Sequence, residues 1–343
     1  MKKKSKTLSN RFIFLINTIV AVVLLLSYIL PYISPERAPI LAILSLFVPI
    51  MILANILFAI YWVLRLKKEF FLSTFVVLVG YGYLGHVYKL SGKEILMNDD
   101  LKIMSYNVKM FNHYGWNTND SIASKMYDFI KNQDPDILTI QEFYHGENIQ
   151  IDFPYQYIKT KAKKNKFGMA TYSKFPIVNS GSLDLQNTSN NIIFTDIVKG
   201  MDTIRIYNIH LESFGIKPDQ ENFGEENSDR LMKRMKKAFK QQAIQTEIFL
   251  EHQASWRGKS IITGDFNNTA FSWVYRQIAK DKQDAFKVAG KGLGKTFDYS
   301  YPLRIDFILP DTHFEVHHFQ NFDVKYSDHF PIMARISLKK DFE

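Results

Sequence analysis

Three long apolar stretches follow one another in the N-terminal part of the chain. They span Phe12–Leu30, Ile40–Leu64 and Phe70–Tyr88, and each approaches or exceeds the roughly 20 residues that a helix needs to cross a bilayer. A signal peptide is the alternative for the first stretch alone, but its apolar run is long and no small-residue cleavage site follows. We therefore predict a membrane region over residues 1–90 with about three transmembrane helices.

A different pattern begins near Leu101, after a short polar linker over residues 91–100. Apolar and polar residues alternate in Leu101–Asn107, which predicts a strand with one buried face. Further strands are predicted at Ile137–Ile140, Gly168–Ser173, Asn191–Val198, Thr203–Ile209, Ser260–Thr263, Arg304–Leu309, Phe314–Phe319 and Ile332–Leu338. Helical spacing predicts helices only at 121–132, 230–252 and 271–279. Many strands with few helices between them predict an α/β fold over residues 101–343, a four-layer sandwich of two sheets flanked by helices.

Charge is distributed unevenly between these two parts. Up to Ser91 the chain has ten Lys and Arg residues and two acidic ones, whereas the remainder has 33 basic and 32 acidic residues. The basic balance therefore belongs to the membrane region, and the large domain is nearly neutral. This argues against a polycation that holds nucleic acid mainly by neutralising phosphates.

The short loops predict the topology. Basic residues concentrate before the first apolar stretch and in Arg65–Glu69, between the second and third. The positive-inside rule puts both in the cytoplasm. Three crossings then place the large domain outside the cytoplasm, in a multi-pass protein of the cell membrane. If Phe70–Tyr88 is re-entrant instead, the large domain is cytoplasmic.

Candidate chemistry lies at the ends of the predicted strands. The chain has no cysteine, which excludes disulfides, thiolate metal sites and a cysteine nucleophile. Gly264-Asp265-Phe266-Asn267 follows an apolar strand and offers a carboxylate and a carboxamide at a sheet edge, although the same letters are common in turns. In chain order, the polar residues at strand ends are Asn107, Glu142, His210, Asp265, Asn267, Asp306, Asp328 and His329.

The order and the local sequences of these residues resemble the endonuclease/exonuclease/phosphatase superfamily, the deoxyribonuclease I-like fold. The matching segments are Ser-Tyr-Asn-Val (105–108), Leu-Thr-Ile-Gln-Glu (138–142), Phe-Gly-Met-Ala-Thr-Tyr-Ser-Lys-Phe-Pro-Ile (167–177), Asn-Ile-His-Leu (208–211), Thr-Gly-Asp-Phe-Asn (263–267), Arg-Ile-Asp-Phe-Ile (304–308) and Ser-Asp-His-Phe-Pro-Ile (327–332). The resemblance implies hydrolysis of a phosphodiester or phosphomonoester by in-line attack of water. It also implies a divalent metal, Mg²⁺ with Mn²⁺ as a substitute.

The resemblance further implies a role for each residue. Oxygen ligands suit Mg²⁺, and the expected ligands are Asn107, Glu142 and Asp328. The expected catalytic residues are His210, Asp265, Asn267, Asp306 and His329, and the expected phosphate contacts are Asn267, His210 and Thr296. In the Asp306–His329 pair the acid fixes the imidazole tautomer and favours its charged form. Whether Asp265 or His329 accepts the proton of the attacking water stays open.

The substrate class stays open as well. The expected partners are a lipid bilayer and a phosphate ester, which is a phospholipid head group, a nucleic acid or a small phosphodiester; no obligate protein partner is expected. A near-neutral domain held at a bilayer favours the lipid or the small phosphodiester. The alternatives are a nuclease acting on DNA or RNA and a catalytically inactive, membrane-tethered binding module. The inactive module would lack a residue of the site, and none of the expected residues is missing.

Overall fold

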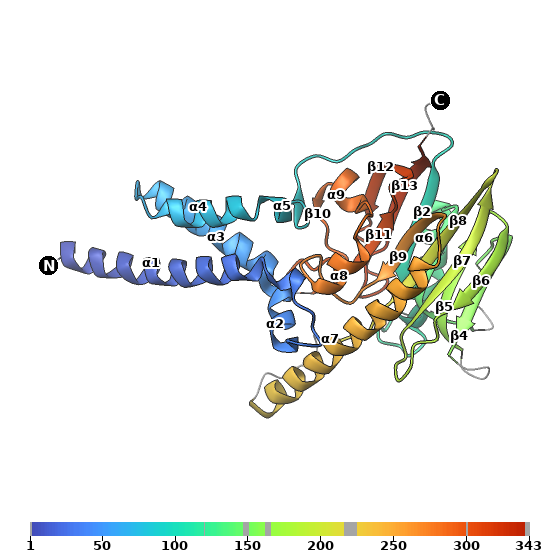
Figure 1. Ribbon diagram of the computed structural model, residues 1–343, viewed down its shortest axis with the longest axis horizontal. Helices are drawn as coiled ribbons and strands as arrows, with labels where there is room; N and C mark the ends of the chain where they lie inside the picture. Colours follow the sequence, from blue (N-terminus) through green and yellow to red (C-terminus); the bar gives the residue numbers. More distant parts are fainter. Residues whose placement is uncertain are drawn as a thin grey trace.

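The protein has a helical N-terminal bundle that projects from one end of a larger α/β domain (Figure 1). The computed structural model describes residues 2–119, 121–146, 151–161, 166–215, 225–299 and 301–339. The two parts correspond to the predicted membrane region and the predicted large domain.

Two β-sheets pack against each other in the large domain. One has the order β12-β13-β2-β3-β5-β4 and the other β11-β9-β8-β7-β6. The strands are β2 (Leu101–Asn107), β3 (Ile137–Tyr144), β4 (Tyr155–Thr160), β5 (Phe167–Ser173), β6 (Ile177–Ser182), β7 (Asn191–Lys199), β8 (Asp202–His210), β9 (Lys259–Asp265), β11 (Asp306–Pro310), β12 (Phe314–Asn321) and β13 (Ile332–Leu338). Strands β2 and β3 pair in parallel, as do β8 and β9. A two-stranded ribbon of β1 (Tyr88–Lys89) and β10 (Gly292–Leu293) lies outside these sheets.

Buried apolar side chains from both sheets form the central layer, because the alternation along each strand turns one face inward. Ile103 and Ile137 of one sheet share a cluster with Ile206 and Ile261 of the other. Polar contacts also cross this layer: Thr263 Oγ1 donates to Thr139 Oγ1 at 2.9 Å. The sheets are therefore held in a defined relative position.

Helices cover the two outer faces. Helix α6 (Ile122–Gln133) packs Met126 and Ile130 onto the β2–β3 sheet. Helices α7 (Glu225–Ala254) and α8 (Trp273–Ile278) pack Phe249 and Val274 onto the β8–β9 sheet. The layers run helix, sheet, sheet, helix, so the predicted fold class is confirmed.

Two of the four edge strands of these sheets, β4 and β6, escaped prediction, whereas the edge strands β11 and β12 were predicted. β4 and β6 are the outermost strands of their sheets and are largely exposed or half-buried, so they lack a regular alternation of apolar residues. The short helix α9 (Ala285–Ala289) was also not predicted. The predicted bounds of β2 and β13, in contrast, agree with the structure.

The N-terminal bundle consists of α1 (Lys2–Ser27), α3 (Val48–Leu64) and α4 (Phe70–Val79), with the short α2 (Pro39–Leu44), η2 (Ser45–Phe47) and α5 (Tyr81–Leu84). Two helical stretches, Leu8–Tyr32 and Pro39–Leu64, are long and apolar enough to cross a membrane by length and composition. α4 has only ten residues.

The third predicted membrane helix is interrupted at Gly80. A Cβ there would lie 2.0 Å from Tyr28 Oη, so a larger residue at this position would displace the Tyr28 side chain. Beyond it, α5 continues along the bundle toward the large domain (Figure 1).

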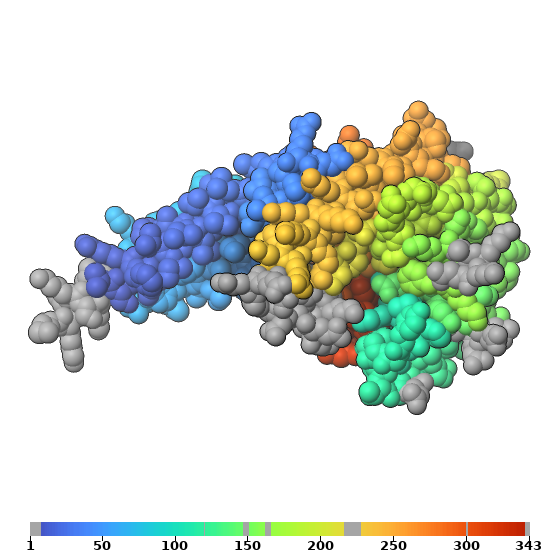
Figure 2. Space-filling view, turned by 90° about the horizontal axis from the view of Figure 1, so that it is seen from below, coloured from blue at the N-terminus to red at the C-terminus, as the bar shows by residue number. Residues whose placement is uncertain are grey.

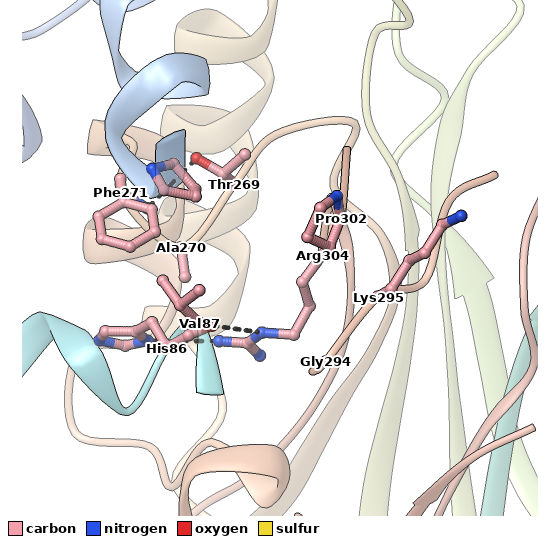
Figure 3. Close-up of a pocket in the computed structure, with 10 residues that line it drawn as sticks. His86, Val87, Thr269, Ala270, Phe271, Gly294, Lys295, Pro302 and Arg304 are labelled. Carbon is pink, nitrogen blue, oxygen red and sulfur yellow. Dashed lines mark hydrogen bonds between the residues drawn. The ribbon is translucent and has the colours of Figure 1, made fainter. Parts of the chain in front are cut away.

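The bundle is joined to the large domain by polar and apolar contacts. The Arg304 guanidinium donates from Nε to the His86 carbonyl oxygen at 3.4 Å, and its Nη2 lies 3.3 Å from His86 Nδ1 (Figure 3). Arg304 also pairs with Asp284, Nη2 to Oδ2, at 2.8 Å. Elsewhere, α2 and η2 pack Ile43 and Leu46 against α7, and the space-filling view shows the blue α2 segment beside the gold α7 (Figure 2).

Candidate active site

The parallel strand pairs bring the predicted residues to one edge of the sandwich. β2 ends at Asn107, whose register partner Gln141 immediately precedes Glu142 on β3. β8 ends at His210 and β9 at Asp265, and these two residues are register partners. Parallel strands have their carboxyl ends at the same edge of a sheet. The two parallel pairs therefore place the side chains of these four strand-end residues close together.

Asn107 lies between two carboxylates. Its Nδ2 donates to Asp265 Oδ2 at 3.0 Å and to Glu142 Oε1 at 3.3 Å. Burial, reinforced by the nearby charge of Asp328, raises the pKa of Glu142. The carboxylates of Glu142 and Asp328 are therefore close enough to repel each other.

Two residues of the site have left-handed backbone conformations. Glu142 has a φ of 49° and Asn267 a φ of 48°, and the β3–β5 register shifts between Ile140 and Phe143, at the position of Glu142. Non-glycine residues adopt such conformations at a cost, and they concentrate at functional sites.

His329 lies between two aspartates. Its Nδ1 is 3.0 Å from Asp306 Oδ2, and its Nε2 is 3.6 Å from Asp265 Oδ2. Burial alone would lower the pKa of His329, but the carboxylates of Asp306 and Asp265 raise it to about 10. Burial raises the pKa of Asp265 to about 7; Asp306 adds to this rise and His329 opposes it. The imidazole is therefore charged at neutral pH, and Asp265 titrates near neutrality.

His210 is also buried, yet its Nε2 has no hydrogen-bond partner among the described residues. This nitrogen lies 3.7 Å from Asp265 Oδ2 and 3.9 Å from Glu142 Oε1. Burial and the neighbouring His329 lower the pKa of His210 to about 3. The ring is thus neutral, and in the tautomer with a proton on Nε2 it can donate into the site.

Asn267 lines the pocket, but its amide is already engaged. Nδ2 donates to the Leu211 carbonyl oxygen at 2.9 Å and to Asp265 Oδ2 at 3.3 Å. The Asn267 backbone N–H donates to Asp265 Oδ1 at 2.7 Å. Asn267 therefore fixes the Asp265 carboxylate, and a donor bond to a phosphoryl oxygen would replace one of the two amide bonds.

Thr296 does not reach the pocket. Its hydroxyl accepts from the backbone N–H groups of Ile305 at 2.9 Å and Asp306 at 3.1 Å, and the residue is fully buried. In this structure it positions the start of β11, where Asp306 lies, and it is not among the residues that line the pocket.

Asp328 lines the pocket and pairs with a residue that the sequence analysis overlooked. Lys109 Nζ lies 2.6 Å from Asp328 Oδ2 and 4.6 Å from the centre of the Trp116 ring. Lys109 also begins a run of four residues with positive φ, Lys109–Asn112, directly after β2. The one clue to Lys109 in the sequence was its position two residues after Asn107, a predicted site residue.

The structure contains a compact group of potential metal ligands that differs from the predicted one. Asp265, Asp306 and His329 offer ligand atoms that all lie within 4.8 Å of one another. The predicted set of Asn107, Glu142 and Asp328 lies beside this group. Both nitrogens of His329 face carboxylates, whereas the Glu142 side chain is 26% exposed and faces the pocket.

A pocket of about 210 Å³ opens over these residues. Glu142, Asn267, Asp328 and His329 form one part of its lining. The rest is largely apolar or aromatic: Leu46, Phe47, Phe214, Leu231, Met235, Phe297, Tyr299, Tyr301, Leu303 and Ile305, with Ser213. The sequence did not predict this second part, because its residues come from four separate segments.

Two sequence families match the chain. The family described as Endonuclease/Exonuclease/phosphatase matches residues 104–329. A domain of unknown function (DUF8431) matches residues 10–87, which correspond to the N-terminal bundle. No curated protein matches the chain.

Solved structures share the fold at low sequence identity. The human Nocturnin catalytic domain with bound sulfate is 17% identical, with a TM-score of 0.54 over 71% of this chain and 95% of that one. An endonuclease/exonuclease/phosphatase from Bacteroides vulgatus is 19% identical, with a TM-score of 0.54 over 71% of this chain and 100% of that one. TDP2 from C. elegans is 18% identical, with a TM-score of 0.50 over 71% of this chain and 76% of that one. The matches cover the large domain and establish its fold.

Proposed function

The chain belongs to the Endonuclease/Exonuclease/phosphatase family, and we propose that it is a membrane-anchored phosphoesterase that hydrolyses its substrate with water and a divalent cation. The observation that carries this proposal is the convergence of Asn107, Glu142, Asp265 and His210 from two sheets at one place, where Glu142 lines the pocket. Members of this family are typically phosphoester hydrolases. The proposed cation is Mg²⁺, for which Mn²⁺ can substitute.

The residues present fit such a cation. The nearby carboxylate of Asp328 adds to the effect of burial in raising the pKa of Glu142, and a divalent cation between these two carboxylates would relieve their repulsion. The carboxylates of Glu142 and Asp328 and the amide oxygen of Asn107 are hard oxygen donors of the kind that Mg²⁺ prefers. We assign these three residues as its ligands, since the nitrogens of His329 are committed to aspartates. When bound, the cation would neutralise charge on the phosphoryl oxygens.

The proton transfers are assigned to the residues beside this group. Asp265 is the proposed general base, because a pKa of about 7 suits proton transfer at neutral pH. His329 is charged and therefore cannot accept the proton of the attacking water; held by Asp306, it stabilises the ionised Asp265. This favours Asp265 over His329 as the base.

His210 and Asn267 complete the proposed machinery. The neutral His210 ring can donate a hydrogen bond from its unpaired Nε2 to a phosphoryl or leaving-group oxygen. Asn267 holds Asp265 in position through its backbone N–H, with its amide as a further phosphate contact. Thr296 acts as a positioning residue for Asp306.

The anchor is proposed from the N-terminal bundle. Two helical stretches have the length and hydropathy of membrane spans, and the third apolar stretch runs beside them (Figure 1). Bundle and catalytic domain share packed residues, such as Leu46 with Met235, so the site would lie close to the membrane surface.

Metal dependence can be tested with the full-length protein in detergent micelles and bis(4-nitrophenyl) phosphate as the substrate. We expect chelation to abolish hydrolysis and added Mg²⁺ or Mn²⁺ to restore it. Glu142→Gln should lower turnover by roughly 100-fold or more, since a metal ligand is lost. Mg²⁺ should raise the melting temperature of the wild type but not of this variant.

The matched control is Glu251→Gln, because Glu251 is an exposed residue of α7. This variant should retain both activity and the Mg²⁺-dependent rise in melting temperature. Hydrolysis that survives thorough chelation would contradict the proposed metal dependence.

A further inference from the structure

The pocket over the candidate site has two chemically different ends. Charged and hydrogen-bonding side chains, among them Glu142, Asp328 and His329, form one end. Leucine, methionine and phenylalanine side chains form much of the other, including Leu46, Leu231 and Met235. A ligand that fills the pocket must therefore be polar at the reacting group and apolar next to it.

Part of the apolar wall belongs to the N-terminal bundle. Leu46 and Phe47 come from η2, the segment between α2 and α3. They face Phe214 and the α7 residues Leu231 and Met235 of the catalytic domain across the pocket. The wall is thus built where the proposed membrane anchor meets the enzyme (Figure 2).

An exposed apolar row continues from this wall along α2, which belongs to the candidate membrane span Pro39–Leu64. Phe47, Leu44 and Ile40 are 40%, 41% and 54% exposed, and they follow one another along η2 and α2. Large apolar side chains exposed in a row near a candidate anchor are typical of a lipid-facing surface.

We propose that the substrate is a membrane lipid with a phosphoester head group, whose hydrocarbon chain lies along this apolar wall. The proposal rests on the proposed phosphoesterase function and adds its substrate class. The phosphoester enters the polar end beside Glu142 and His210. Leu46, Phe47 and Leu231 hold the hydrocarbon chain, and the exposed apolar side chains of α2 continue this contact surface.

The charge of the pocket disfavours a nucleic acid in the same place. Among the described residues that line it, none is a lysine or an arginine, whereas proteins hold a polyanionic backbone mainly through basic side chains. The catalytic part of the sequence is also nearly neutral, with 33 basic and 32 acidic residues after Ser91.

Two chromogenic phosphodiesters test the proposal: hexadecyl 4-nitrophenyl phosphate and ethyl 4-nitrophenyl phosphate. They share the leaving group and differ only in the alkyl chain. With the full-length protein in detergent micelles and Mg²⁺, we expect kcat/KM for the hexadecyl ester to exceed that for the ethyl ester by roughly 100-fold, since apolar pockets discriminate by chain contacts.

Variants of the wall separate binding in the pocket from partition into micelles. Phe47→Ser and Leu231→Ser should each lower the hexadecyl-to-ethyl ratio by roughly 10-fold, because each removes part of the chain's contact surface. Micelle partition is the same for all variants, so it cannot produce this change. Met201→Ser, at a fully exposed apolar residue of the β7–β8 turn, should leave the ratio unchanged. Melting temperatures in the same micelles establish that each variant is folded.

The outcomes distinguish this inference from the proposed function. Hydrolysis of neither ester would count against the phosphoesterase itself. Equal kcat/KM for both esters, with Glu142→Gln inactive on both, would leave the phosphoesterase standing and overturn the lipid substrate. A chain preference that Phe47→Ser and Leu231→Ser both retain would overturn the assigned wall. Faster turnover of a single-stranded oligonucleotide than of the hexadecyl ester would favour a nuclease instead.

Discussion

Asn107 Nδ2 donates a hydrogen bond of 3.0 Å to Asp265 Oδ2, and this bond joins the ends of β2 and β9, which belong to different sheets. Both residues are buried. The candidate site therefore depends on the spacing between the sheets as much as on the residues themselves. A change that moves β9 by a fraction of an ångström should separate Asp265 from its donor.

Gly264, immediately before Asp265, offers such a change. Its φ is +129°, and a Cβ at this position would lie 2.0 Å from the Ile209 carbonyl oxygen on β8. We expect Gly264→Ala to lower the free energy of unfolding by about 2–6 kcal/mol, through backbone strain and overpacking, and to abolish hydrolysis. Gly82→Ala is the control, because nothing lies within 4 Å of its added Cβ. Equal stability of the two variants in denaturant unfolding would contradict the close β8–β9 contact.

The pH dependence of hydrolysis should report Asp265 and His329. If ionised Asp265 is the base, kcat/KM should fall as the pH drops below about 7, where the carboxylate protonates. If charged His329 is required, kcat/KM should also fall as the pH rises above about 10. Removing the negative charge in Asp306→Asn disfavours the imidazolium, so the alkaline limb should move to lower pH while metal binding persists. An alkaline limb that does not move would contradict the pairing.

The same two residues should act as one unit in a double-mutant cycle. We expect His329→Ala to lower kcat/KM by roughly 10²–10⁴-fold and Asp306→Asn by a smaller factor. The double variant should be little worse than His329→Ala, because Asp306 acts through the imidazole. If the two losses multiply instead, the residues act separately, and the role of Asp306 must be reassigned.

The buried Arg304–Asp284 ion pair, where the N-terminal bundle meets the large domain, should stabilise the fold. Arg304 and Asp284 are both buried and paired at 2.8 Å; burial alone would raise the pKa of Asp284, but Arg304 holds it below its ordinary value. Arg304→Gln leaves a buried carboxylate without its cation, so we expect the free energy of unfolding at pH 7 to fall by about 3–5 kcal/mol. The stability that this depressed pKa contributes is present at neutral pH and is lost on acidification below about pH 4. The difference in unfolding free energy between wild type and Arg304→Gln should therefore be smaller at that acidic pH than at pH 7.

Arg276→Gln is the matched control for this pair, because Arg276 is exposed and contacts the Tyr32 ring of the bundle. Its change in unfolding free energy should stay within about 0.5 kcal/mol. Similar losses in Arg304→Gln and Arg276→Gln would show that the buried pair contributes no more than a surface contact.

The sequence predicted what local patterns encode. Buried strands such as β2 and β13 were found with their bounds, since a strand with a buried face carries an apolar repeat. The strand-end residues were found because the family resemblance and the strand ends coincide at Asn107 and Asp265. Edge strands such as β4 were missed because a largely exposed strand needs no such repeat.

What the sequence could not supply is how distant segments meet. Lys109 pairs with Asp328 across 219 residues, and no local pattern links them. Leu46 and Met235 meet only because α2 packs on α7. Thr296 stays a predicted phosphate contact, but its hydroxyl also accepts from the backbone N–H of Asp306, a bond that depends on how the loop before β11 folds back.

If the N-terminal bundle anchors the protein, the side of the membrane on which the large domain lies depends on residues 70–88. In the structure, α4 and α5 run back along α3, so the turn between α3 and α4 lies at the end of the bundle away from the large domain (Figure 1). At the other end, His86 contacts Arg304 of the large domain (Figure 3). If α1 and α3 cross the membrane, this returning segment carries the chain across the same thickness, and the basic turn faces the cytoplasm. We therefore expect alkaline phosphatase fused after Glu343 to be active, because this enzyme works only outside the cytoplasm, and β-galactosidase fused there to be silent. Fusions after Lys68 should give the reverse pattern, which provides the control within the same chain. If fusions after Glu343 and Lys68 report the same side, residues 70–88 do not cross, and the catalytic domain is cytoplasmic.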